Sequence, residues 1–112
     1  MADTLKNIRV MHDAAAGTAV LDGAASHIYT ILSVSICNSH ASNAEIFSMF
    51  VTTGGKASPV YIYKLQPLPA QATFVHNDKI VLNASDELWV DYASDLDDTL
   101  GVHVVVSYLD QG

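Results

Sequence analysis

The feature that most constrains the fold is an alternation of apolar and polar residues with a period of two. Between residues 28 and 36 it places Ile28, Thr30, Leu32, Val34 and Ile36 on one face of an expected strand. Further strand patterns are expected at 45–52, 60–65, 73–75, 80–83, 88–92 and 102–108, with weaker ones at 8–11 and 18–21. Successive side chains of a strand point to opposite faces, so the pattern predicts sheet, with less than about one tenth of the chain in helix.

The spacing of these strands predicts an antiparallel β-sandwich. Short strands every 8–12 residues or so, separated by turns, are typical of sandwich and jelly-roll folds. We expect one all-β domain at 26–112, jelly-roll-like, with about eight strands. Residues 1–25 are small, polar and loosely patterned, so they are expected to form an N-terminal arm or an edge segment. The strand at 45–52 is apolar on both faces, as in a strand covered on both sides or exposed to a partner.

The charge content indicates assembly and argues against several partners. Only 15% of the residues are charged, against roughly 25% in typical soluble domains, which suggests that part of the surface does not face water. The net charge is −7 and the five basic residues are scattered, so direct nucleic-acid or anionic-membrane binding is not expected. The sequence has no uninterrupted apolar run of about 18 residues and no signal-peptide pattern, which predicts synthesis in the cytoplasm.

Reactive groups do not cluster in the sequence. The five histidines stand singly, whereas zinc sites usually contain a close ligand pair. Cys37 lies in an apolar run and is expected to be a small buried residue. The acidic group Asp91, Asp95, Asp97 and Asp98 lacks the glycine and distal glutamate of an EF-hand, so a solvated turn is favoured over a calcium site. We therefore predict no catalytic residue, no cofactor and no metal, and the protein is not expected to be an enzyme.

Three aromatic residues are the candidate interface anchors. Trp89 alternates with Leu88 and Val90, so it can face outward, and Tyr61 and Tyr63 share a strand pattern. Tryptophan and tyrosine are enriched at the energetic centres of protein interfaces. Outward aromatic rings also stack on sugars, so a carbohydrate-binding module for a host surface is the alternative from another class.

From Ile28 to Leu109 the chain resembles small β-sandwich virion proteins of tailed bacteriophages. The residues that carry the resemblance form a strand ending in Asn38, a Pro-rich bend and an acidic turn before Trp89. Their sequences are Tyr-Thr-Ile-Leu-Ser-Val-Ser-Ile-Cys-Asn at 29–38, Leu-Gln-Pro-Leu-Pro-Ala at 65–70, Lys-Ile-Val-Leu at 79–82 and Asn-Ala-Ser-Asp-Glu-Leu-Trp-Val at 83–90. The pattern is shared by decoration, head–tail adaptor and fibre-associated proteins, so it indicates a class rather than one position.

The resemblance implies a protein of the virion, with capsid decoration (cement) as the first expectation. Its partners would be other copies of itself, with a trimer favoured, and the major capsid protein or another virion protein. A tail, collar or fibre-associated protein is the structural alternative. Such a protein works by contact alone, closing seams between subunits, and its acidic charge keeps the free form soluble.

Overall fold

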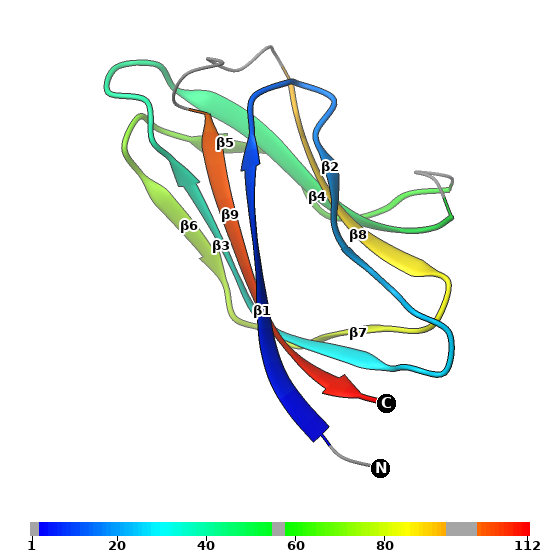
Figure 1. The fold of residues 1–112 in the computed structure, drawn as a ribbon. Coiled ribbons are helices and arrows are strands. Elements are labelled where there is room, and N and C mark those ends of the chain that lie inside the picture. The colour runs from blue at the N-terminus through cyan, green and yellow to red at the C-terminus, as the bar shows by residue number, and fades with distance from the viewer. Residues whose placement is uncertain (1–2, 55–57, 94–100) are drawn as a thin grey trace.

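The computed structural model describes residues 3–54, 58–93 and 101–112, and these residues form nine β-strands and no helix. In chain order the strands are β1 (Asp3–His12), β2 (Thr18–Asp22), β3 (Tyr29–Asn38), β4 (Glu45–Thr53), β5 (Val60–Leu68), β6 (Thr73–His76), β7 (Ile80–Leu82), β8 (Asp86–Tyr92) and β9 (Val102–Gln111). They form two layers that pack face to face (Figure 1). The expected all-β, jelly-roll-like sandwich is confirmed.

Each layer is an antiparallel sheet built from strands that are distant in the sequence. Sheet A has the order β1-β9-β3-β6, and β7 also pairs with β3, alongside a different part of that strand. Sheet B has the order β2-β8-β4-β5. The longest pairing joins the two ends of the described chain, from Asp3 opposite Gln111 to His12 opposite Val102. The first and last strands therefore lie side by side in sheet A.

The core fills the space between the two sheets. Its buried aliphatic and aromatic residues are Val20, Leu21, Ile31, Val34, Ile36, Phe47, Met49, Leu68, Leu82, Leu88, Val90, Tyr92, Val102, Val104, Val106 and Tyr108. They come mostly from alternate positions of each strand, as the period of two requires. Burying each large apolar side chain contributes about 1.5–3 kcal/mol, so this layer is the main source of stability.

The N-terminal segment occupies edge positions in both sheets. β1 is an edge strand of sheet A and pairs with β9 over all ten of its residues. β2 is an edge strand of sheet B, and its Val20 and Leu21 are 0% and 4% exposed in the core. Within the described part of residues 1–25, β1 and β2 are edge strands of this chain's own two sheets.

The side-chain alternation expected along β3 changes side at a β-bulge. The register between β3 and β9 shifts between Ile31 and Ser33. Ile31 therefore faces the core together with Ile36, while Leu32 is half-buried at the outer surface. Ile28 lies just before the strand and is 45% exposed. A bulge adds one residue and reverses the alternation beyond it. The expectation of one shared face was therefore wrong: Val34 and Ile36 face the core, whereas Thr30 and Leu32 face outward.

Polar side chains join the two sheets at one end of the sandwich. His12 is buried, with Nδ1 2.7 Å from the Tyr92 hydroxyl and Nε2 2.7 Å from Thr18 Oγ1. Burial lowers the pKa of His12 and raises the pKa of Tyr92, because both charged forms lose their hydration. This network is therefore neutral at pH 7 and links β1, β2 and β8.

An ionic cluster lies near the chain termini. The Asp110 carboxylate accepts a hydrogen bond from Lys6 Nζ at 2.8 Å and lies 2.7 Å from His27 Nδ1. The hydrogen bonds from Lys6 and His27 lower the pKa of Asp110. The contact holds the ends of β1 and β9 together beyond their backbone ladder.

Candidate functional site

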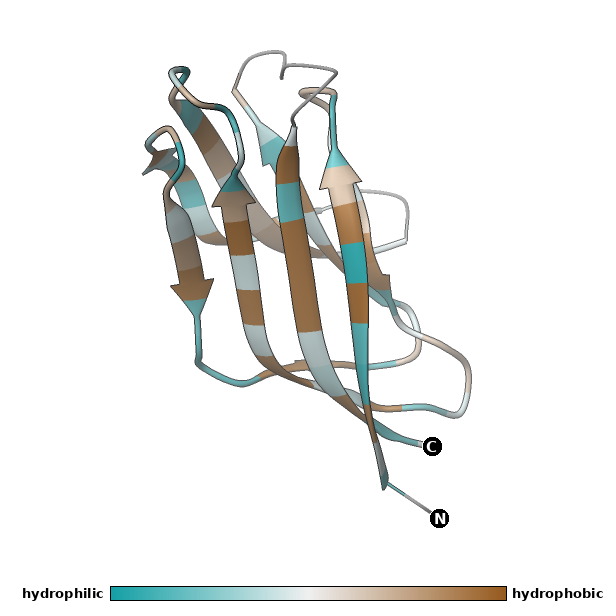
Figure 2. Cartoon of the chain, turned by 60° about the vertical axis from the view of Figure 1, so that its left-hand side comes forward, coloured by the Kyte–Doolittle hydropathy of each residue, from teal (hydrophilic) through white to brown (hydrophobic). Residues whose placement is uncertain are grey.

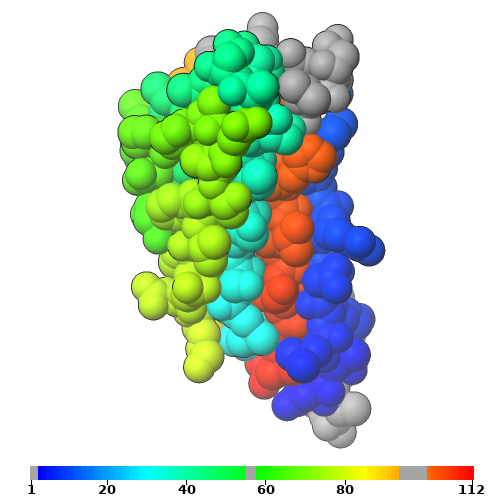
Figure 3. All heavy atoms as spheres, turned by 90° about the vertical axis from the view of Figure 1, so that its left-hand side faces the viewer, coloured from blue at the N-terminus to red at the C-terminus, as the bar shows by residue number. Residues whose placement is uncertain are grey.

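The outer surface of sheet A is a broad, weakly polar face. We call it the sheet A face; it consists of the outward side chains of β1, β9, β3, β6 and β7. Its apolar members are Leu5, Met11, Leu32, Val75, Val81, Val105 and Leu109. Leu5 is 73% exposed and Val81 is 53% exposed. Figure 2 shows apolar residues along β9, β3 and β6, and Figure 3 shows the strands of this sheet as one continuous surface.

Charge is nearly absent from the sheet A face. Among the outward positions of its described strands, only Asp3 and Arg9 are charged, and both lie on the edge strand β1. Between the apolar residues lie small polar ones, among them Ser35 and Ser107. A protein with a net charge of −7 thus presents one face whose central strands carry no charge. Depletion of charged residues is the compositional sign of an interface core.

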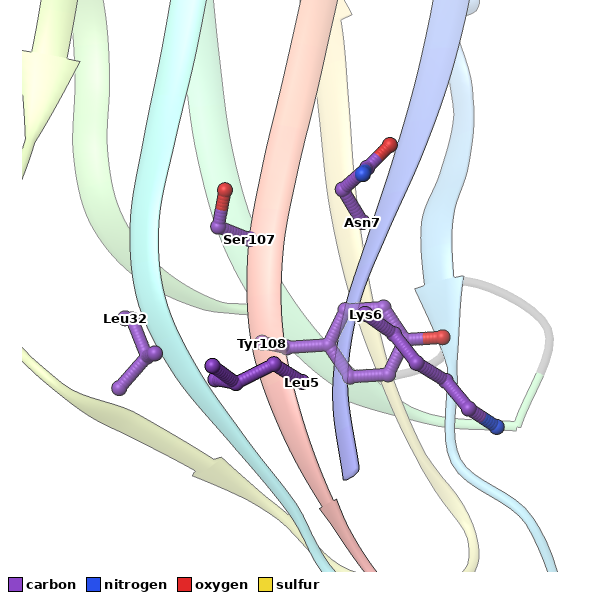
Figure 4. Close-up of a pocket in the computed structure, with 6 residues that line it drawn as sticks. All are labelled: Leu5, Lys6, Asn7, Leu32, Ser107 and Tyr108. Carbon is purple, nitrogen blue, oxygen red and sulfur yellow. The ribbon is translucent and has the colours of Figure 1, made fainter. Parts of the chain in front are cut away.

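A shallow hollow of about 350 Å³ lies at this face. Its lining residues are Leu5, Lys6, Asn7, Leu32, Ser107 and Tyr108 (Figure 4). Ser107 and Asn7 are short and pair across β9 and β1, which leaves the surface low at that point. Leu5 and Leu32 rise from the strands on either side of β9, and Leu32 reaches the surface because of the bulge in β3. The hollow therefore has apolar walls at Leu5 and Leu32, a small polar floor at Ser107 and Asn7, and the charged side chain of Lys6 in its lining.

The outer surface of sheet B carries an aromatic cluster instead. Phe50 on β4 is 0% exposed although it points away from the core. The Trp89 ring on β8 stacks on the Phe50 ring, with 6.2 Å between the ring centroids and 11° between the ring planes. The centroid of the Tyr61 ring on β5 lies 5.3 Å from that of Phe50. Lys64 Nζ lies 4.5 Å from the centre of the Tyr61 ring. These contacts cover Phe50 within the chain, which explains why β4 is apolar on both faces.

Acidic residues border this aromatic cluster. Glu87 accepts hydrogen bonds from Trp89 Nε1 at 2.9 Å and from Thr52 Oγ1 at 3.2 Å. Asp22 on β2 lies opposite Glu87. Burial, followed by repulsion from Glu87, raises the pKa of Asp22. Asp91 faces outward two residues beyond Trp89. Sheet B is therefore both aromatic and negatively charged on its outer side.

The structure separates the three predicted anchors. Trp89 and Tyr61 meet at Phe50, whereas Tyr63 turns toward the core at the edge formed by β5 and β6. The Tyr63 hydroxyl lies 2.8 Å from His76 Nδ1, and its ring meets Phe74 edge-on at 4.8 Å. Tyr63 thus closes the open edge of the sandwich and is not at the outer surface with the other two.

Sequence reasoning missed the sheet A face, and it misjudged Cys37. No single residue of that face is unusual, so the only signal was the low charge content of the chain. Cys37 faces outward beside His103 and is half-buried rather than part of the core. Among the described residues, no group of three or more metal-ligating side chains lies together. Of the acidic group, Asp91 lies on β8, whereas Asp95, Asp97 and Asp98 lie outside the described residues.

Comparisons with known proteins provide fold-level likeness only. No family model and no curated protein matches the chain. The structure is similar to Eiger TNF from S. frugiperda, with 13% identity, a TM-score of 0.37, and coverage of 89% of this chain and 83% of that one. It is also similar to the globular domain of zebrafish complement 1qA protein, with 11% identity, a TM-score of 0.40, and coverage of 95% and 92%. At these scores the likeness carries no argument about function. Within the described part of the chain, no helix is long and apolar enough to cross a membrane.

Proposed function

We propose that this protein is a structural component of a larger protein assembly and acts by surface contact, without catalysis. The observation that carries the proposal is the sheet A face, whose central strands present apolar and small polar side chains and no charge. An extended exposed face of this kind is typical of a surface that is covered in the working state. The chain is then one element of a repeated contact, and closed symmetry is the rule for such contacts.

The finer proposal is a virion protein of a tailed bacteriophage, made in the host cytoplasm, with capsid decoration first. It rests on the resemblance at residues 28–109, and its partners are other copies and the major capsid protein or another virion protein. The trimer favoured from the sequence remains a prediction. The structural alternative, a tail, collar or fibre-associated protein, predicts the same fold and a different copy number.

The test is the copy number of this chain in purified particles, measured by quantitative mass spectrometry against a major shell protein. Hundreds of copies support decoration, while about three to twelve move the protein to the neck, tail or fibre. Absence from particles contradicts the virion proposal.

A carbohydrate-binding function finds little support in the aromatic cluster. One face of the Trp89 ring is stacked on Phe50, and the Lys64 ammonium lies over the Tyr61 ring. A sugar platform needs flat ring faces open to the ligand. Glycan-array binding by the isolated protein, lost in Trp89→Ala, would nevertheless replace the assembly proposal.

A further inference from the structure

We infer that the sheet A face binds a second copy of this chain, with Val105 near the centre of the contact and the hollow beside Leu5 filled by the other copy. This inference rests on the proposed function and names its first partner. Three observations favour a second copy over another occupant: the charge distribution, the area of the face and its relief.

The charge distribution makes this face the easiest approach for a like-charged molecule. Two copies that each carry −7 repel one another over most orientations. The outer side of sheet B carries Asp22, Glu87 and Asp91, with Lys64 beside Tyr61, so a second copy meets more like charge there than on the sheet A face. On the sheet A face the charged outward residues are Asp3 and Arg9, which have opposite signs. A basic partner would be drawn to sheet B, whereas an uncharged face suits an equally uncharged one.

The area of the sheet A face matches a stable contact. β1, β9 and β3 have ten residues each, and β6 and β7 add four and three residues beside β3. With strands about 4.8 Å apart and about 3.3 Å per residue, the flat area is roughly 600 Å². Two such faces together bury about 1,200 Å², which is the lower end of the range for specific interfaces. Protruding side chains add to this figure. The face is therefore large enough for a specific contact between two copies.

The sheet A face carries both a protruding apolar side chain and a hollow that could receive one. Leu5 is 73% exposed and stands at the rim, and the hollow beside it is floored by Ser107 and Asn7. An apolar side chain from a facing copy gains contacts with Leu5 and Leu32 when it enters this hollow. Such complementarity within one surface is what contacts between identical chains require.

The experiment measures mass by light scattering and sedimentation over a dilution series. The wild-type chain is expected at about twice its 12.0 kDa mass, because a face that binds the same face of a second copy closes as a two-fold dimer. Val105→Glu places a carboxylate near the centre of the face, beside its cross-strand neighbour Arg9. It is expected to weaken association by about tenfold or more, because covering this carboxylate with a second copy removes its hydration even when Arg9 lies beside it. Ile46→Glu is the matched control: it changes an aliphatic residue that is 41% exposed on the outer side of sheet B, and it is expected to leave the mass unchanged. Far-ultraviolet circular dichroism checks that each variant is folded.

A second variant tests the same contact in case Val105→Glu disturbs the fold. Leu5→Glu changes a side chain that is 73% exposed, so the fold tolerates it, yet it charges the rim of the hollow and is expected to weaken association as well. Mixing Val105→Glu with Val105→Lys is then expected to restore the oligomer, since opposite charges meet only if the two faces meet.

The outcomes separate the inference from the proposed function. A monomeric wild-type chain that is nevertheless abundant in particles overturns the inference and leaves the assembly role. Dissociation by Ile46→Glu together with a normal mass for both Val105→Glu and Leu5→Glu also overturns it, because the contact then lies on sheet B. An oligomer with the expected variant pattern that is absent from every particle supports the inference and contradicts the virion role.

Discussion

The outer faces of the two sheets differ in how completely the chain covers its own apolar side chains. On sheet B, Phe50 lies outward yet is 0% exposed, because Trp89 and Tyr61 lie against it. On sheet A, Leu5 and Val81 lie outward and stay 73% and 53% exposed. On sheet B the covered apolar residue is the central Phe50, under two aromatic rings, while Val60 and Leu65 of the edge strand β5 remain 69% and 59% exposed. On sheet A the neighbouring outward residues are smaller, so exposed apolar side chains extend over its central strands as well as its edges.

The largest effect on stability is expected from removing residues 1–25. This deletion takes an edge strand from each sheet, so neither outer face stays complete. The truncation deletes the ten-residue ladder to β9 and the core residues Val20 and Leu21. We expect no cooperative unfolding transition in urea, measured by Trp89 fluorescence. A truncated chain that still unfolds in a normal cooperative transition would show that residues 1–25 are not needed for the fold.

The next largest effects compare one outward residue from each sheet by its contribution to the free energy of unfolding. Phe50→Ala is expected to lower the free energy of unfolding by about 3–5 kcal/mol, because a fully buried ring leaves a cavity. Val105→Ala, the counterpart on sheet A, is expected to cost less than about 1 kcal/mol in the dissociated chain, because its side chain is partly exposed. Urea denaturation of both variants at low concentration provides the values. Equal losses would show that the two outer faces are covered to the same degree.

A smaller pair of effects concerns one carboxylate from each sheet. Lys6 and His27 lower the pKa of Asp110 from its ordinary 3.8, so its stabilisation is present at neutral pH and is lost as pH falls through the lowered value. Burial and Glu87 raise the pKa of Asp22 above 3.8, so its charge costs stability at neutral pH, and this cost disappears as pH falls below 3.8. At pH 7, Asp110→Asn is expected to lower the thermal midpoint and Asp22→Asn to raise it slightly. Both differences should shrink toward pH 3, and a reversed sign for either residue contradicts the assignment.

The smallest expected effect is a spectroscopic one. Trp89 is the single tryptophan of the chain and lies on the sheet opposite the proposed contact. Its emission maximum should therefore stay constant while dilution dissociates the oligomer. The Leu5→Trp variant, with its indole on the sheet A face, should shift to longer wavelength over the same dilution. A shift in the wild-type chain would place the contact on sheet B.

The strand pattern, the absence of helix in the described residues and the low charge content were all readable from the sequence. They are local or additive properties: a period of two describes neighbouring residues, and net charge is a total. The outward position of Trp89 followed in the same way from its buried neighbours Leu88 and Val90. Local pattern also placed Tyr61 and Tyr63 together, since they lie two residues apart and normally share a face.

The fold settled what depends on residues that are distant in the sequence. A bulge against β9 sent Leu32 outward, and irregular pairing between β4 and β5 left Tyr61 at the surface while Tyr63 turned to His76. The sheet A face exists because β9 lies between β1 and β3, from which it is separated by more than half of the chain. No local pattern records which strands become neighbours, because that choice depends on how all the strands pack in the whole sandwich. For the same reason the bare surface left over, and with it the place for a second copy, is visible only once all the strands are in position.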